Sequence, residues 1–263
     1  MTHPAYGVLR QVTPFAAVLL EDNPGTMTLD GTNTWLLRAP DSPTCVVVDP
    51  GYEDEPHLRR VVEAAGEVAA ILITHHHPDH VQGAPWLARA TGAPIRAWNR
   101  TLCAGEGPLR DGEVLTLAGL DLEVRHTPGH TADSICLTIA HADQTAVLTG
   151  DTVLGRGTTV IAPPDGDLGQ YLASLRLLAA TPPGTVVLPG HGPDLPDLPT
   201  TAAEYLSHRE QRLDQIRAAL THLGPNATAR QVVEVVYADV DQSLWPAAEW
   251  SVHAQLAYLR KTA

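Results

Sequence analysis

The stretch that most constrains this chain is the run Thr-His-His-His-Pro-Asp-His at positions 74–80. It directly follows the apolar run 68–73, which has the composition of a strand buried on both faces of a sheet. The loop at the carboxyl end of such a strand is where open α/β sheets bind ligands. Imidazole suits zinc and other borderline cations, and a carboxylate can hold a metal or its bound water. Four side chains of the run can therefore coordinate a metal: His75, His77, Asp79 and His80.

Three later stretches supply further potential ligands. His130, Asp151 and His191 each stand directly after a glycine, at or just beyond the end of an apolar, strand-like run. Glycine lets the backbone turn sharply, so these side chains can reach the same edge as the first cluster. A solvent-exposed histidine-rich turn, as in an expression tag, is the simpler interpretation of 74–80. Such a turn would not follow a buried strand in mid-chain or be matched three times later. Seven ligands predict two metal sites.

These stretches resemble the motifs of the metallo-β-lactamase-fold hydrolase superfamily. His-x-His-x-Asp-His at 75–80, followed by His130, Asp151 and His191, has the order of the superfamily's principal motifs, which also include the strand-end aspartate Asp49. The resemblance implies an enzyme, a metal-dependent hydrolase, with an α/β fold. That fold is a four-layer αββα sandwich, in which two β-sheets lie between two layers of helices. Periodicity alone indicates only a layered α/β protein.

Within the superfamily, the chain is most similar to the β-lactamase-like protein 2 group. Stretches 23–37, 155–160 and 205–209 carry this likeness, which extends over nearly the whole chain. It implies a metallo-β-lactamase-fold catalytic domain at residues 1–199 and a C-terminal helical, partly winged-helix-like extension at residues 200–263. Because the chain stops about where a wing would start, we expect the extension to shape the active-site mouth. Whether it also binds nucleic acid stays open.

The resemblance also assigns the metal ligands position by position. One metal would be held by three histidines: His75, His77 and His130. The second would be held by a carboxylate and two histidines: Asp79, His80 and His191. Asp151 would lie between the two metals.

Two cations are expected because a hydroxide bound between them is a good nucleophile near neutral pH, while the metals stabilise charge on the electrophile and the leaving group. Asp79 can orient this nucleophile and accept its proton, which is the role of a general base. Zinc is the expected metal, and iron or manganese also fits. Asp49 is expected to orient a liganding histidine by a hydrogen bond. Successive side chains of an extended backbone point to opposite sides, so His76 is expected to point away from the ligands His75 and His77.

Four further residues are predicted substrate contacts because they lie in polar stretches that resemble the group. They are Asn33, Thr34, Thr131 and His208.

The charge balance limits the partners. A net charge of −13 and a pI near 5.3 argue against broad adhesion to anionic membranes or double-stranded nucleic acid, although a local basic groove stays open. The arginines that could form such a groove are Arg156, Arg209, Arg212 and Arg217. The three cysteines form no C-x-x-C pair, which favours a reducing compartment. The apolar run 15–20 is too short for a secretory or membrane-spanning segment, so we expect a cytoplasmic protein.

Hydrophobic periodicity and turn residues predict two series of strands, each completed by helices. The first series comprises strands at 8–11, 15–21, 35–38, 45–49 and 68–73, with helices at 53–66 and 83–91. The second comprises strands at 95–98, 113–117, 120–126, 134–140, 145–148 and 185–188, with a helix at 168–180. After a proline-rich linker at 192–199, helices are predicted at 201–223, 227–237 and 246–261.

The substrate class stays open between two kinds of compound. One is a phosphodiester, in particular single-stranded RNA, because the β-lactamase-like protein 2 group includes endoribonucleases. The other is a small acyl compound, an ester, thioester or lactone, as in the thioesterase-type and glyoxalase-type relatives. An iron-dependent oxidoreductase of the same fold is an alternative of another class. A binding protein that has lost its metal is not favoured, because all seven ligands are present. The oligomeric state is not predicted.

Overall fold

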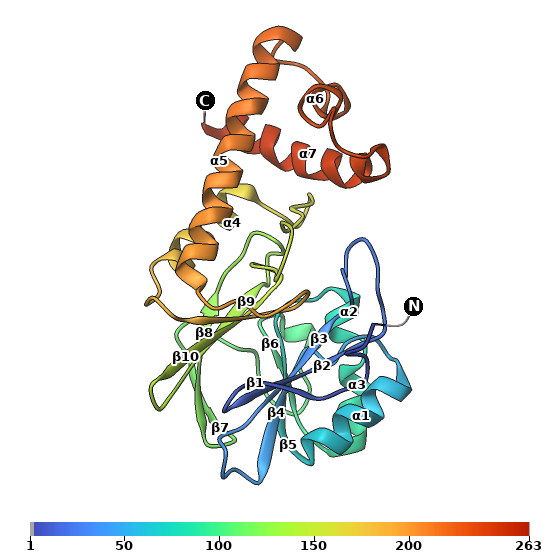
Figure 1. The fold of residues 1–263 in the computed structure, drawn as a ribbon, viewed down its shortest axis with the longest axis vertical. Coiled ribbons are helices and arrows are strands. Elements are labelled where there is room, and N and C mark those ends of the chain that lie inside the picture. Colours follow the sequence, from blue (N-terminus) through green and yellow to red (C-terminus); the bar gives the residue numbers. More distant parts are fainter. Residues whose placement is uncertain (1–2, 263) are drawn as a thin grey trace.

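Two mixed β-sheets lie against each other at the centre of the computed structural model, which describes residues 3–262 (Figure 1). The first sheet has six strands in chain order: β1 (Arg10–Thr13), β2 (Ala16–Leu20), β3 (Asn33–Leu37), β4 (Thr44–Val48), β5 (Glu67–Ile73) and β6 (Ile95–Ala97). The second has five, in the order β11 (Val186–Pro189), β10 (Gln144–Gly150), β9 (Ile135–His141), β8 (Leu120–His126) and β7 (Val114–Leu117).

Both sheets combine antiparallel pairs with a parallel part. Strands β1 to β4 pair antiparallel, whereas β4, β5 and β6 run parallel to one another. In the second sheet, β10 and β11 are parallel and the remaining pairs are antiparallel. Parallel neighbours bring their carboxyl ends to one edge. The segments that leave β5, β8, β10 and β11 carry the predicted ligands, and the segment that leaves β4 carries Asp49.

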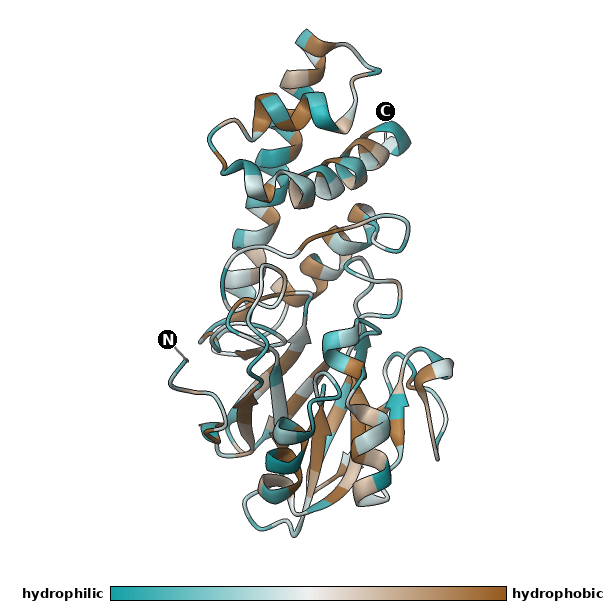
Figure 2. Ribbon diagram, turned by 90° about the vertical axis from the view of Figure 1, so that its right-hand side faces the viewer, coloured by the Kyte–Doolittle hydropathy of each residue, from teal (hydrophilic) through white to brown (hydrophobic). Residues whose placement is uncertain are grey.

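Helices cover the outer faces of the two sheets and complete four layers. Helices α1 (Glu55–Ala65) and α3 (Ala84–Thr91) pack on the first sheet, and α4 (Leu168–Ala179) lies with the hydrophobic cluster outside the second. Between the sheets, apolar side chains from both, among them Trp35, Leu72 and Leu137, form the main core. Figure 2 shows hydrophobic residues in brown along these central strands. The predicted αββα sandwich is therefore confirmed.

The C-terminal extension consists of three helices: α5 (Leu198–Leu223), α6 (Ala229–Val236) and α7 (Trp245–Thr262). Helix α5 begins earlier than predicted, because Asp197 caps it by accepting a hydrogen bond from the Thr200 amide and Pro199 is tolerated in a first turn. The predicted domain boundary at 199/200 thus falls inside α5. The first half of this helix packs on α4 through Ala202, and its second half joins the core of the extension through Ile216.

Short elements and strand ends account for the other differences. The ligand loop includes a single helical turn, α2 (Pro78–Val81), where the sequence predicts only a loop, because four residues are too few to show helical periodicity. Two short 3₁₀ helices, at Arg100–Leu102 and Gln242–Leu244, were also missed. Strand β1 begins two residues later than predicted. Among residues 3–262, no helix is both long and apolar enough to cross a bilayer.

His57, a buried histidine of α1, gives a prediction about acid stability. Its Nε2 lies 2.9 Å from the Oγ1 atom of Thr34, and burial, followed by the charge of Arg60, lowers its pKa from 6.5 to about 4. The unfolded chain takes up this proton below pH 6.5 but the folded chain does so only near pH 4, so acid destabilises the fold in this window. We expect His57→Leu to reduce the loss of unfolding free energy between pH 7 and pH 4 by about 3 kcal/mol.

Urea unfolding of both proteins at several pH values, with a chelator present so that metal release does not contribute, measures this difference. Thr34 Oγ1 also donates to the carbonyl of Asp49 at 2.9 Å, so the variant leaves no hydroxyl without a partner. Parallel curves of unfolding free energy against pH for the two proteins would contradict the prediction.

Candidate metal centre

All seven predicted ligands meet at the edge where the parallel strands end. Three sets of side chains offer ligand atoms that lie within 4.8 Å of one another: His75, His77 and His130; His75, His80 and Asp151; Asp79, His80 and His191. These sets share His75 and His80, so they form one continuous cluster. The cluster contains residues that are up to 116 positions apart in the sequence, from 75 to 191.

Two kinds of backbone bring the first four ligands inward. His77 has an extended backbone, with φ and ψ of −61° and 143°, and its Nδ1 lies 3.0 Å from His75 Nε2, so the two rings point into the same space. Pro78 then starts α2, and this single turn brings Asp79 and His80 back towards the same point. The spacing His-x-His-x-Asp-His thus suits an extended segment followed by one helical turn.

The later ligands follow three strands of the second sheet: His130 comes after β8, Asp151 after β10 and His191 after β11. Strands β10 and β11 are parallel, and Gly150 is paired with Pro189, so Asp151 and His191 leave the sheet side by side. Gly190 can carry no side chain, since a Cβ there would lie 2.5 Å from Asp151 Oδ1 and 2.8 Å from His80 Cε1. The glycines beside these ligands therefore allow close approach as well as a sharp turn.

The ligand atoms are close enough to share two cations. In one half of the cluster, His77 Nδ1 lies 3.0 Å from both His75 Nε2 and His130 Nε2. In the other half, His191 Nε2 lies 3.2 Å from both His80 Nε2 and Asp79 Oδ2. The carboxylate of Asp151 is 3.4 Å from His191 Nε2, 3.6 Å from His80 Nε2 and 3.7 Å from His130 Nε2. It thus reaches both halves.

The chemistry of this donor set fits metal ions. Asp151 Oδ1 is buried and has no hydrogen-bond partner among residues 3–262, which is a costly state for a carboxylate oxygen. Several imidazole nitrogens and carboxylate oxygens converge on the same space, and a cation would satisfy them together. Such a set suits zinc, iron or manganese.

Hydrogen bonds outside the cluster fix the orientation of three ligand rings. His80 Nδ1 donates to Asp49 Oδ2 at 2.9 Å, His130 Nδ1 to the Val160 carbonyl at 2.8 Å, and His191 Nδ1 to the Gly31 carbonyl at 3.0 Å. Each bond leaves the Nε2 atom facing the cluster. The sequence indicated Asp49, but the two carbonyls carry no residue-type signal and could not be found from sequence.

Burial and the neighbouring charges shift the pKa values of the cluster residues in different directions. Burial lowers the pKa of His75 well below 6.5 and that of His77 to about 4, so both rings are neutral and offer lone pairs. Burial alone would lower the pKa of His191, but Asp151 and Asp79 raise it to about 11. Burial alone would raise the pKa of Asp151, but His191 and His80 hold it well below its usual value. Metal binding is therefore expected to displace protons.

Asp49 gives a second prediction. Its carboxylate accepts bonds from His80 Nδ1 and from the Thr74 amide and hydroxyl, at 2.8 and 2.7 Å for the latter two. We expect Asp49→Asn to weaken binding of the metal held by His80 by about 10- to 100-fold, because the ring loses its charged acceptor. Titration against a chromogenic chelator measures this affinity. Asp133→Asn is the control, because Asp133 pairs at 2.8 Å with His76, which is not in the cluster. Equal effects of the two variants would contradict the prediction.

His76 points away from the cluster, as expected, with 39% of its side chain exposed. The side chains of Asn33, Thr34 and Thr131 are buried and hydrogen-bonded within the protein, and their contact with a substrate stays a prediction. Asn33 Nδ2 donates to the carbonyls of Pro189 and Gly192, and so ties β3 to the loop that carries His191. The carbonyl groups of a buried loop need hydrogen-bond donors, and a polar side chain such as Asn33 supplies them.

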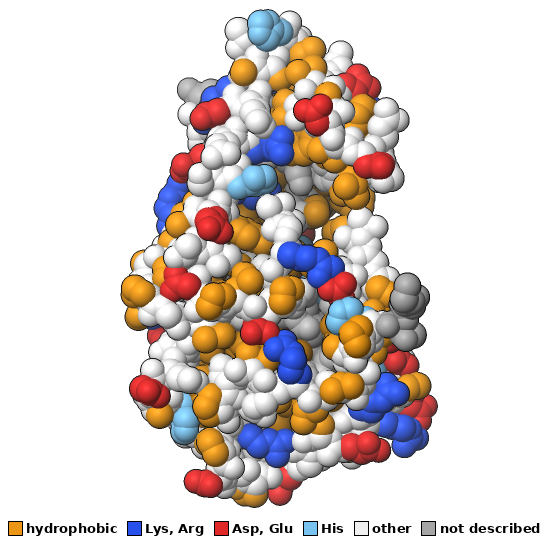
Figure 3. Space-filling model, viewed as in Figure 1, with side chains coloured by type: hydrophobic (Ala, Val, Ile, Leu, Met, Phe, Trp, Pro, Cys, Tyr) orange, Lys and Arg blue, Asp and Glu red, His pale blue; other side chains and the backbone are white. Residues whose placement is uncertain are grey.

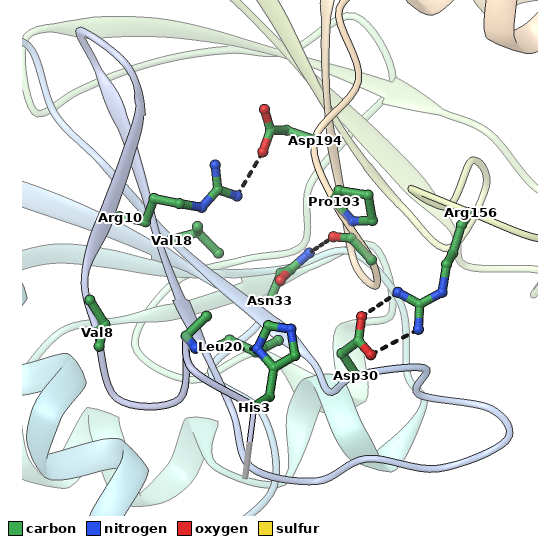
Figure 4. A pocket seen from close by; sticks show the side chains of 12 residues that line it. His3, Val8, Arg10, Val18, Leu20, Asp30, Asn33, Arg156, Pro193 and Asp194 are labelled. Carbon is green, nitrogen blue, oxygen red and sulfur yellow. Dashed lines mark hydrogen bonds and ion pairs between the residues drawn. The ribbon is translucent and has the colours of Figure 1, made fainter. Parts of the chain in front are cut away.

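The four arginines considered for a basic groove do not form one track. Arg156 forms a two-pronged ion pair with Asp30 beside a pocket of about 430 Å³ that Asn33 also lines (Figure 4). Arg217 pairs with Asp214 at 2.7 Å. Arg209 and Arg212 instead line a different pocket, together with His208, the fourth predicted substrate contact.

Comparisons with known proteins agree with the fold and with the cluster. A profile of the Metallo-beta-lactamase superfamily matches residues 27–191, and one of the Beta-lactamase associated winged helix domain matches residues 228–262. The Beta-lactamase-like protein 2 homolog of Drosophila melanogaster is 32% identical over 263 residues, covering 92% of this chain and 87% of that protein.

Solved structures show the same architecture. A Beta-lactamase domain protein from Burkholderia ambifaria has a TM-score of 0.84 and 23% identity, over 99% of this chain and 90% of that one, which supports the fold alone. TTHA1623, solved in a di-iron-bound form, has a TM-score of 0.53 and 28% identity, over 75% of this chain and 98% of that one.

Proposed function

This chain belongs to the metallo-β-lactamase superfamily, whose members are hydrolytic enzymes, and on that premise we propose that its cluster binds two metal ions and hydrolyses small acyl compounds. The observation that carries the metal part is the convergence of imidazole rings on a buried carboxylate, Asp151, whose Oδ1 has no hydrogen-bond partner among residues 3–262. The expected ions are zinc, with iron or manganese as alternatives.

The residues of the cluster would divide the chemistry between them. Two bound cations supply a hydroxide nucleophile near neutral pH and stabilise negative charge on the electrophile. Asp79 is the expected general base. Burial alone would raise the pKa of its carboxyl, but the hydrogen bond from His191 lowers it below 3.8, so it is ionised and can accept a proton at neutral pH. Its side chain is 13% exposed, more than those of its neighbours His80 and His191, which leaves it at the open side of the cluster.

Two observations favour an ester, thioester or lactone as the substrate. The pocket beside the cluster holds only about 270 Å³, and part of its wall consists of apolar side chains, including Val240, Leu244 and Ala247. Two of the four arginines considered for an RNA backbone, Arg156 and Arg217, are paired with carboxylates, which leaves only Arg209 and Arg212 for it. A compact, partly apolar pocket suits an acyl group better than a polynucleotide.

Single-stranded RNA is the second candidate. It is favoured by the winged-helix profile that matches residues 228–262 and by the likeness to the Beta-lactamase-like protein 2 homolog. The same cluster could act on a phosphodiester, since two cations stabilise the attacking and leaving oxygens of that reaction as well.

Metal analysis and a substrate panel test the proposal together. Protein purified without added metal is expected to contain about two first-row metals per chain. The panel offers an acyl thioester, a lactone, a bis-aryl phosphodiester and single-stranded RNA to the wild type, His77→Ala and Asp79→Asn. We expect the acyl compounds to be hydrolysed by the wild type and both variants to lose this activity. A folded wild type without metal, or activity equal in the variants, would reject the metal-dependent mechanism, and cleavage of RNA alone would select the second candidate.

A further inference from the structure

A pocket lies between the catalytic domain and the C-terminal extension, and its wall holds two arginines that form no ion pair with a carboxylate of residues 3–262. Figure 3 shows a hollow on this face, where the helical extension meets the body of the molecule, with cationic and histidine side chains near its border. The pocket has a volume of about 270 Å³. It is bounded by α5, by residues 158–160, by the loop that carries Met27, and by α7 with the turn before it.

Arg209 is the unusual side chain of this pocket. It is only 4% exposed, its guanidinium lies 5.1 Å from the centre of the Tyr171 ring, and Nη2 donates to the Thr159 carbonyl. Its Nε atom is buried and has no hydrogen-bond partner among residues 3–262, and no ion pair joins it to a carboxylate of that part of the chain. A buried guanidinium is normally paired with an anion, because its charge has lost water.

Two neighbouring groups strengthen this cationic wall. Arg212, one turn further along α5, stacks over the Tyr237 ring at 4.3 Å and bonds to a neutral amide oxygen of Gln215. His208 has a buried Nδ1 atom that also lacks a partner among residues 3–262. Burial, and then the charges of Arg209 and Arg212, lower the pKa of His208, so that its ring is neutral and can donate one hydrogen bond.

The pocket is coupled directly to the metal cluster through residues 158–160. The Val160 carbonyl accepts a bond from the ligand His130 at 2.8 Å, and the Thr159 hydroxyl donates to the carbonyl of Asp151 at 2.8 Å. The other side of the same segment lines the pocket and receives Arg209. Residues 158–160 therefore link the pocket to the cluster, because this segment bonds to the ligands His130 and Asp151 and also to Arg209.

We propose that this pocket binds an acidic group of the substrate, a carboxylate or a phosphate, through Arg209, Arg212 and His208. This inference rests on the proposed function, since it names the part of the substrate that lies away from the bond to be hydrolysed. Arginine presents several donors in one plane and so binds either anion with two hydrogen bonds. The apolar side chains of Met27 and Leu244, 48% and 42% exposed, would contact the chain that joins the acidic group to the acyl carbon.

A binding experiment tests the pocket without relying on hydrolysis. Inorganic phosphate and succinate are titrated calorimetrically into the His77→Ala protein, so that the cluster contributes as little as possible. Arg212→Gln added to this background is expected to weaken binding by about 10- to 100-fold, the usual effect of losing a charge-assisted hydrogen bond. Arg217→Gln, on the same helix but paired with Asp214, is the matched control and is expected to change nothing.

A kinetic experiment then tests the link to the reaction. For a thioester that ends in a free carboxylate, Arg212→Gln is expected to raise KM by about 10- to 100-fold with little change in kcat, whereas the methyl-capped thioester is unaffected. A phosphate-ended thioester shows which anion is preferred. Arg209→Lys, which keeps the charge but loses the planar fork, is a second variant should Arg212→Gln fold poorly.

Three outcomes would overturn the proposal: equal anion binding with and without Arg212, equal loss in the Arg217→Gln control, or equal loss of activity on the acidic and capped thioesters. Failure of the proposed function is distinguishable from these. A protein that hydrolyses no acyl compound but binds phosphate or succinate through Arg212 would keep the anion pocket and lose the assigned reaction.

Discussion

Replacing Asp151 with asparagine is expected to remove most of the bound metal and to lower hydrolysis by more than about 100-fold, the upper end of the loss seen when an outer partner of a metal ligand is removed. The reason is its position: its carboxylate lies within 3.7 Å of ring nitrogens from both halves of the cluster. Asparagine has almost the same shape but no charge, so it cannot balance two cations. Elemental analysis and kcat/KM on the hydrolysed acyl substrate measure the two effects.

The same substitution at an exposed aspartate is the control. Asp121 accepts a hydrogen bond from the Thr116 hydroxyl at 2.7 Å, lies on the exposed side of β8 and is in none of the three ligand sets. Asp121→Asn is expected to keep the full metal content and activity. An Asp151→Asn protein that still holds about two metals per chain would show that this carboxylate is not shared between them.

Replacing Gly129 with alanine is expected to lower the free energy of unfolding by about 3–5 kcal/mol, because backbone strain and steric overlap act at the same position. Gly129 has a φ of +134°, which side chains rarely allow, and a Cβ there would lie 2.5 Å from the Cβ of Tyr171 and closer still to its backbone. The Gly129 carbonyl also accepts the amide of Asp167, the cap of α4. An alanine side chain would therefore fit at position 129 only if α4 moved away from the sheet.

Gly184→Ala separates the two causes. Gly184 has a φ of +78°, but a Cβ there would meet no atom within 4 Å, so only backbone strain of about 1–2 kcal/mol is expected. Urea unfolding of both variants measures the difference. Equal losses in the two proteins would show that the contact with Tyr171 relaxes without cost, contrary to our expectation.

Much of the fold could be predicted because its signals are local. The strand at 120–126 alternates apolar and polar residues, and β8 has the same bounds. Apolar residues recur at helical spacing in the predicted helix at 168–180, and those in α4 are buried: Tyr171, Leu172, Leu175 and Leu178. The start of α5 was less predictable, because a cap such as Asp197 resembles an ordinary turn residue until its hydrogen bond is seen.

Sequence alone determined the chemical type of the cluster: imidazoles and carboxylates at fixed spacings beside glycines, on strands that end together, leave few uses other than metal binding. The tertiary structure alone decided which carbonyls orient His130 and His191, why Thr34 and Thr131 turn inward, and why the buried Nε of Arg209 has no partner among residues 3–262. These features depend on contacts between segments far apart in the chain, such as the bond between His191 and Gly31 across 160 positions. The sequence shows which side chains can donate, accept or bind a metal. Their partners are decided only when the sheets and helices pack.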